Sequence, residues 1–90
     1  MNFKGLAIEQ QVIRLLSDLV AIESVNPEYK GGQRGEVGVA EYVANYLRAL
    51  NIEPTFQNVI GERANVLGTL RGAHDATLIF EAHMDTVTLE

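Results

Sequence analysis

The chain has 90 residues, a formal net charge of −5, 47% hydrophobic residues and no cysteine. This length allows one small domain, and the hydrophobic content excludes a disordered chain, which would lack the apolar surface that offsets its ordering entropy. The acidic balance argues against binding to nucleic acid or to an anionic membrane, and the lack of cysteine excludes disulfides and thiolate zinc sites.

The sequence also indicates in which cellular compartment the protein is expected. Its purely apolar stretches are only a few residues long, far shorter than a membrane span. The N-terminal residues lack the charged, apolar and small-residue pattern of a secretory signal. We therefore expect a cytoplasmic protein.

Two helices are predicted in the first half of the chain. Apolar residues recur at spacings of three and four over residues 6–22, and we interpret this stripe as core, because a helix of this length usually buries one face in its own domain. The pattern stops in a loop around Pro27 and Gly35, which lacks the Gly-Lys-Ser/Thr sequence of a phosphate-binding loop. A second stripe predicts a helix over residues 36–50, with Asn51 as its left-handed stop.

Three strands are predicted after Asn51, where the hydrophobic period shortens to about two. They cover residues 53–59, 64–70 and 76–82, and the last is continuously apolar, as expected of a central strand covered on both faces. The predicted fold is α/β, with two N-terminal helices packed on a mixed β-sheet.

The sequence His83-Met84-Asp85 follows the last predicted strand. Neutral imidazole is a good zinc ligand, and a ligating histidine usually donates its other ring N–H to a nearby oxygen, which Asp85 can supply directly or through the local backbone. By itself the His-x-Asp spacing is a weak signal, because a strand-end histidine bonded to its neighbour gives the same pattern.

Four segments resemble the M20 family of metallopeptidases and deacylases, which includes acetylornithine deacetylase and succinyl-diaminopimelate desuccinylase. Ala82–Val87 is similar to the family's Gly-His-Met-Asp-Thr-Val signature, although Glu81 and Ala82 replace the commoner Asn-Gly. Ile22–Pro27 resembles Ile-Pro-Ser-Val-Asn-Pro, Gly38–Val43 matches the second helix, and Arg63–Val66 resembles Arg-Pro-Asn-Val. The four segments follow the family's order and cover nearly the whole chain.

This resemblance implies a site with two zinc ions, for which cobalt or manganese could substitute. His83 would ligate one metal and Asp85 would be the catalytic carboxylate that orients the site. The implied reaction is hydrolysis of an amide bond in an N-acyl amino acid or a short peptide, with homodimerisation left open. Arg63 and Asn65 are interpreted as structural, and His74 as an exposed turn residue.

The resemblance further implies a bridging Asp, a Glu-Glu pair with the general base, another acidic ligand and a second His, all expected beyond Glu90. Residues 1–90 would then be the N-terminal part of one catalytic domain and inactive alone, because catalytic zinc usually needs three protein ligands. The alternative from another class is a non-catalytic α/β fragment or interaction module that keeps the family's sequence without its site.

Overall fold

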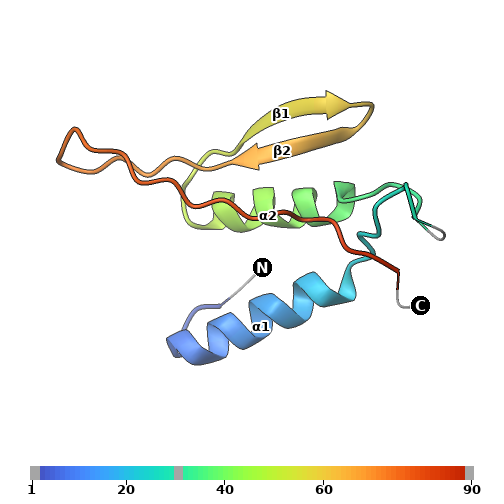
Figure 1. The fold of residues 1–90 in the computed structure, drawn as a ribbon. Coiled ribbons are helices and arrows are strands. Elements are labelled where there is room, and N and C mark those ends of the chain that lie inside the picture. Colours follow the sequence, from blue (N-terminus) through green and yellow to red (C-terminus); the bar gives the residue numbers. More distant parts are fainter. Residues whose placement is uncertain (1–2, 30–31, 89–90) are drawn as a thin grey trace.

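The computed structural model describes residues 3–29 and 32–88, so residues 30 and 31 of the predicted loop lie outside it. Its elements are α1 (Ile8–Ala21), α2 (Val37–Ala49), β1 (Thr55–Ile60) and β2 (Arg63–Leu67), in that order (Figure 1). The α/β class is confirmed, as are both helices, whose ends lie within two residues of the predicted ones.

The C-terminus of α2 was predictable because it depends on residues that are close together in the sequence. Asn51 adopts a positive φ of 62°, as predicted. The backbone N–H of Ile52 donates to the carbonyl of Leu47 at 2.9 Å, and that of Asn51 donates to the carbonyl of Arg48 at 2.9 Å. This is the Schellman pattern, which satisfies two carbonyls that the helix end leaves without partners.

The sheet is an antiparallel hairpin of β1 and β2, in which Thr55 pairs with Leu67 and Asn58 pairs with Ala64. The register shifts between Asn58 and Ile60, and Gly61 takes a positive φ of 56° in the turn. Both strands begin within two residues of their predicted starts, and β2 ends earlier than predicted.

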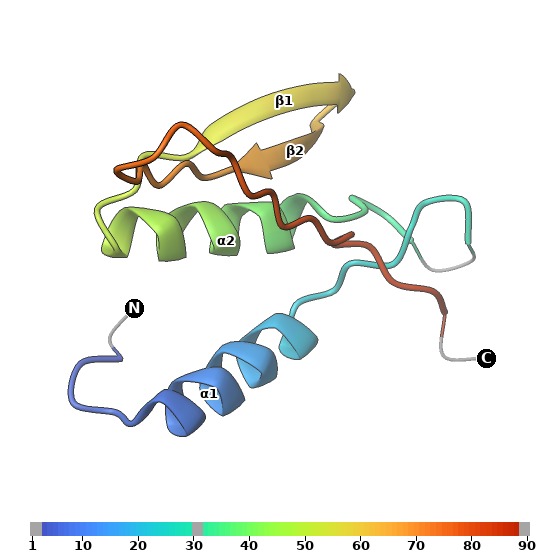
Figure 2. The same ribbon diagram turned by 60° about the vertical axis from the view of Figure 1, so that its left-hand side comes forward.

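The elements form three layers, with α2 between the hairpin on one side and α1 on the other (Figures 1 and 2). The buried hydrophobic side chains come mainly from α2 and are small: Val37, Val39, Ala40, Ala44 and Ala64. The described part of the chain therefore has a thin core, centred where α2 meets β2.

The guanidinium of Arg63 on β2 ties the hairpin to the start of α2. Its Nε lies 3.2 Å and its Nη2 also 3.2 Å from the two carboxylate oxygens of Glu36. Gly35 lies beneath this ion pair with a φ of +62°, and a Cβ there would sit 3.1 Å from Nε of Arg63 and 3.2 Å from Cδ of Pro27. A side chain at this position would need both an unfavourable backbone conformation and a shift of its neighbours. This contact gives Arg63 a structural part in joining β2 to α2.

The prediction of a third strand over residues 76–82 is wrong. After β2 the chain runs out beyond the hairpin and bends at residues 73–75, and residues 76–82 then return along α2 without entering a ladder (Figure 1). Leu78, Ile79 and Phe80 are 78%, 80% and 89% exposed. A central strand needs neighbours on both edges and cover on both faces, and the described residues provide only a two-stranded hairpin. The mixed sheet is accordingly reduced to that hairpin and one isolated parallel bridge between Val25 and Thr86.

The apolar stripe of α1 is likewise not core. None of the side chains of α1, all of which are described, is buried, and Ile8, Val12 and Leu16 are more than half exposed. The hydroxyl of Tyr42 on α2 donates a hydrogen bond to Asp18 on this helix, and Phe3, which precedes the helix, makes an edge-on ring contact with Tyr46 of α2. Within residues 3–29 and 32–88, no helix has the length and hydrophobicity needed to cross a membrane.

Candidate functional site

The segment that carries His83 and Asp85 is docked onto the loop after α1. The backbone N–H of Thr86 donates to the carbonyl of Ser24 at 2.8 Å, and the N–H of Asn26 donates to the carbonyl of Thr86 at 2.9 Å. Ser24 is only 4% exposed, and its hydroxyl lies 3.5 Å from that of Thr86. Two of the segments singled out in the sequence, 22–27 and 82–87, are thus brought together from distant positions.

His83 and Asp85 contact each other directly. Nδ1 of His83 lies 3.0 Å from the backbone carbonyl oxygen of Asp85 and 3.1 Å from its Oδ1. Both neighbours are acceptors, so Nδ1 must carry the hydrogen, and a neutral ring then presents its lone pair at Nε2. Within the described residues Nε2 has no hydrogen-bond partner, so it is open to an external ligand.

Asp85 is held from its other side by Asn26. The amide Nδ2 of Asn26 donates to Oδ2 of Asp85 at 2.8 Å. This bond, followed by the hydrogen bond from His83, holds the pKa of Asp85 below its usual value against the opposing effect of desolvation. Asp85 is therefore an anion at neutral pH, with one oxygen directed to the histidine and the other to the asparagine.

Asn26 was interpreted from the sequence only as a turn residue. The spacing along the chain carries no sign of its contact, because Asn26 and Asp85 are 59 positions apart. The one available indication is that Asn26 belongs to Ile22–Pro27, one of the four segments that carry the family resemblance.

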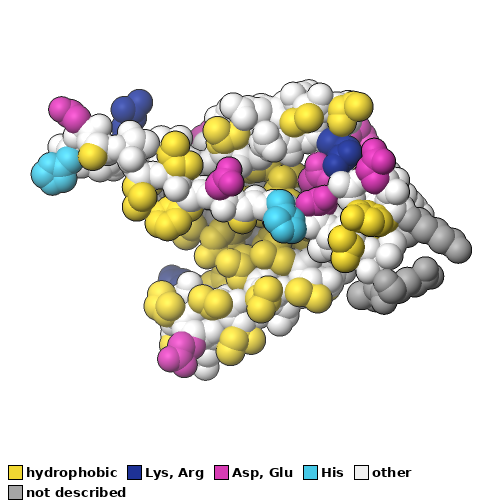
Figure 3. Space-filling model, viewed as in Figure 1, with side chains coloured by type: hydrophobic (Ala, Val, Ile, Leu, Met, Phe, Trp, Pro, Cys, Tyr) yellow, Lys and Arg dark blue, Asp and Glu magenta, His cyan; other side chains and the backbone are white. Residues whose placement is uncertain are grey.

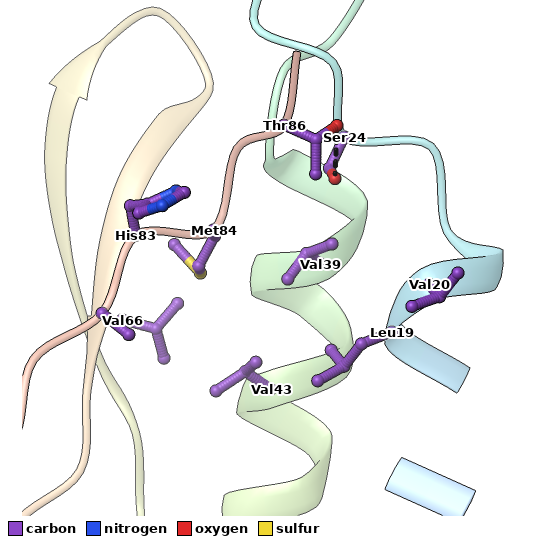
Figure 4. A pocket seen from close by; sticks show the side chains of 10 residues that line it. Leu19, Val20, Ser24, Val39, Val43, Val66, His83, Met84 and Thr86 are labelled. Atoms are coloured by element: carbon purple, nitrogen blue, oxygen red, sulfur yellow. Dashed lines mark hydrogen bonds between the residues drawn. The ribbon is translucent and has the colours of Figure 1, made fainter. Parts of the chain in front are cut away.

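A cavity of about 400 Å³ opens beside His83. It is lined from α1, α2, β2 and the returning segment by Leu19, Val20, Ser24, Val39, Val43, Val66, Ala82, His83, Met84 and Thr86 (Figure 4). The space-filling view shows hydrophobic side chains gathered in the hollow between α1 and the rest of the molecule (Figure 3). The imidazole is itself 86% exposed and the carboxylate of Asp85 is 32% exposed, so the pair lies at the rim of an apolar hollow.

The remaining sequence candidates lie elsewhere. His74 is exposed in the bend at residues 73–75, as expected, and Asn65 is exposed on β2. No group of three His, Cys, Asp or Glu residues suited to a metal ion occurs in the described ranges. The donor chemistry of His83 would fit one position in a metal's coordination sphere, and the described residues offer no group of three ligands that would complete it.

The chain is similar to a protein named as a metallohydrolase. Over 89 residues the chain is 38% identical to the "Uncharacterized metallohydrolase MJ0457" of Methanocaldococcus jannaschii, and the match covers 87% of this chain and 21% of that protein. The chain thus spans about a fifth of the length of this relative. No protein-family profile matches the chain, and no solved structure does.

Proposed function

We propose that this chain is the N-terminal part of a catalytic domain of the M20 type, in a zinc-dependent amidohydrolase or peptidase. Its substrates would be N-acyl amino acids or short peptides, cleaved at an amide bond. The similarity to a protein named as a metallohydrolase supports a metal-dependent hydrolase in general. The finer assignment is supported by the four segments that resemble the M20 family.

The observation that carries the proposal is the state of the His83 ring. Histidines that bind metals through one nitrogen usually donate the other N–H to a carboxylate or a backbone carbonyl. Nδ1 of His83 has both kinds of acceptor, at 3.1 Å and 3.0 Å, and both belong to Asp85. The ring is therefore prepared to bind a metal ion through Nε2.

Each of the two residues has a distinct role in this proposal. Nε2 of His83 would hold one metal ion, while Asp85 would fix the ring's orientation and increase its basicity. A bound zinc ion supplies Lewis acidity toward a carbonyl oxygen and lowers the pKa of water; cobalt or manganese could substitute. The further ligands and the general base would come from residues outside this chain.

The proposal includes a cytoplasmic location, which suits a chain without cysteine. It leaves dimerisation open. Cell fractionation and sedimentation of the native protein test these two points.

The direct test uses the natural protein that contains this sequence. Purified protein should contain zinc and release amino acids from N-acyl amino acids, and a chelator should abolish that release. The 90-residue chain alone should bind zinc more weakly than micromolar in isothermal titration and should show no turnover. Natural protein that holds no metal, or that hydrolyses none of these amides when loaded with zinc, would exclude the proposal.

A second candidate is a non-catalytic interaction module. It is favoured by the exposed side chains of Leu78, Ile79 and Phe80 and by the lack of a three-ligand group in the described residues. The same assay separates the two candidates, because an interaction module would show no metal-dependent turnover at any length of chain.

A further inference from the structure

The side chain of Asn26 makes a hydrogen bond at each end. Its Oδ1 accepts from the backbone N–H of Glu28 at 2.9 Å, and its Nδ2 donates to Oδ2 of Asp85 at 2.8 Å. The orientation of the amide follows from chemistry, since a backbone N–H can face only the oxygen and a carboxylate can face only the NH₂ group. One end therefore fixes the turn at Pro27, and the other reaches the His-x-Asp segment.

The two segments are also joined by backbone bonds that do not involve this amide. The backbone bonds between Ser24, Asn26 and Thr86 hold the loop against the returning segment. The amide instead decides how the carboxylate of Asp85 is turned. With Oδ2 held by Asn26, Oδ1 is left facing Nδ1 of His83 at 3.1 Å.

We propose that Asn26 is a positioning residue that holds the Asp85 carboxylate so that His83 keeps its hydrogen on Nδ1 and presents Nε2 outward. The importance of this contact follows from exposure: an imidazole that is 86% exposed has little packing to fix its orientation, so its hydrogen bonds determine its tautomer. The metal-binding part of the inference rests on the function proposed above.

Asn26→Asp is the sharpest test of this role. The carboxylate keeps an oxygen for the N–H of Glu28, so the turn is retained, but it replaces the donor to Asp85 with a second negative charge. Asn58→Asp is the matched control, because Asn58 is exposed on β1 and its side chain has no hydrogen bond within the described residues. Asn26→Ala, which adds no charge, gives a second variant if the aspartate disturbs the loop.

The readout is the tautomer of His83, measured by nitrogen NMR of the imidazole on the 90-residue chain at a pH where the ring is neutral. His74 is the only other histidine in the sequence and provides an internal reference. We expect the Nδ1–H tautomer in the natural sequence and in Asn58→Asp, and a shift toward Nε2–H in both Asn26 variants. The backbone amide signal of Thr86 reports whether the loop stays docked.

Titration with Zn²⁺ alone, followed at the same ring signals, links this role to metal binding. The Asn26 variants should require about 10–100-fold more zinc for the same response, as is typical when a group supporting a ligand is removed. An unchanged tautomer and zinc response in both variants, with Thr86 still docked, would overturn the inference. A tautomer that depends on Asn26, together with a natural protein that holds no metal, would instead support the positioning role and contradict the proposed function.

Discussion

The hydroxyl of Tyr42 on α2 donates a hydrogen bond of 2.7 Å to Oδ2 of Asp18 on α1. It joins two helices that share little buried surface, since none of the side chains along α1 is buried. Partial burial, followed by this bond to a carboxylate, raises the pKa of Tyr42 to about 12. The hydrogen bond that joins α1 to α2 therefore depends on the hydroxyl of Tyr42 keeping its proton.

The hydrogen bond between Tyr42 and Asp18 should be lost at alkaline pH. Because the pKa of Tyr42 is about 12 in the folded chain and about 10 in an unfolded one, the stabilisation is complete below pH ~10 and is lost as the pH rises toward ~12. Ultraviolet titration should resolve one late tyrosine, which Tyr42→Phe removes and Asp18→Asn moves to lower pH. Titration of all three tyrosines in a single step in the natural sequence would contradict this.

Loss of Arg63 should destabilise the fold. Arg63→Ala leaves the Glu36 carboxylate, whose side chain is only 14% exposed, without its partner, and we expect unfolding to become easier by about 1–3 kcal/mol. Arg63→Lys should restore only part of this, because an ammonium cannot make the forked contact. Chemical denaturation followed by circular dichroism measures the change.

Arg34→Ala is the control for Arg63. Its side chain is 55% exposed and contacts Glu41 at 3.5 Å and Glu62 at 3.9 Å, so its loss should change stability by less than about 0.5 kcal/mol. Equal effects of the two alanine variants would show that the Arg63–Glu36 pair has no special part in joining β2 to α2.

In the natural protein that contains this sequence, substitutions of His83 and of Asp85 should have different effects on metal content and turnover. His83→Ala would remove the proposed metal ligand and should deplete one metal ion together with most turnover. Asp85→Asn keeps the shape but loses the charge that orients the ring, and should retain much of the metal while losing about 10–100-fold in rate. Metal analysis alongside kinetics measures both, and His74→Ala should change neither. Full metal content and near-normal turnover in His83→Ala would contradict the proposed metal role.

The 90-residue chain should self-associate through its extended segment. Leu78, Ile79 and Phe80 are exposed side by side in backbone that lacks ladder partners, and such a segment is a template for pairing with another chain. Sedimentation velocity over a range of concentrations should show association that Phe80→Asp weakens. Thr69→Asp adds the same charge at an exposed position before the bend and should weaken it much less. A monomer at all concentrations would exclude this behaviour.

The features that the sequence predicted correctly depend on local interactions. Helical periodicity and the Asn51 stop are determined within a few residues, and both are present in the structure. The strand over residues 76–82 depends on neighbours that a local pattern cannot supply, so its β-prone composition was misleading. At the site, the contact between His83 and Asp85 was predictable because the residues are two positions apart, whereas the bond from Asn26 joins positions 59 apart.

The bridge between Val25 and Thr86 closes the long loop that follows β2. Closing a loop of about twenty residues costs on the order of 2–3 kcal/mol in chain entropy, and each hydrogen bond at the bridge returns only about 0.5–1.5 kcal/mol. The two contributions nearly balance, so the segment with His83 should open locally while α2 and the hairpin stay folded. The backbone amide of Thr86 should therefore exchange its hydrogen with solvent faster than the backbone amides of the hairpin. An ion that recognises only the closed arrangement would slow this exchange, and its affinity would include the free energy of closing the loop.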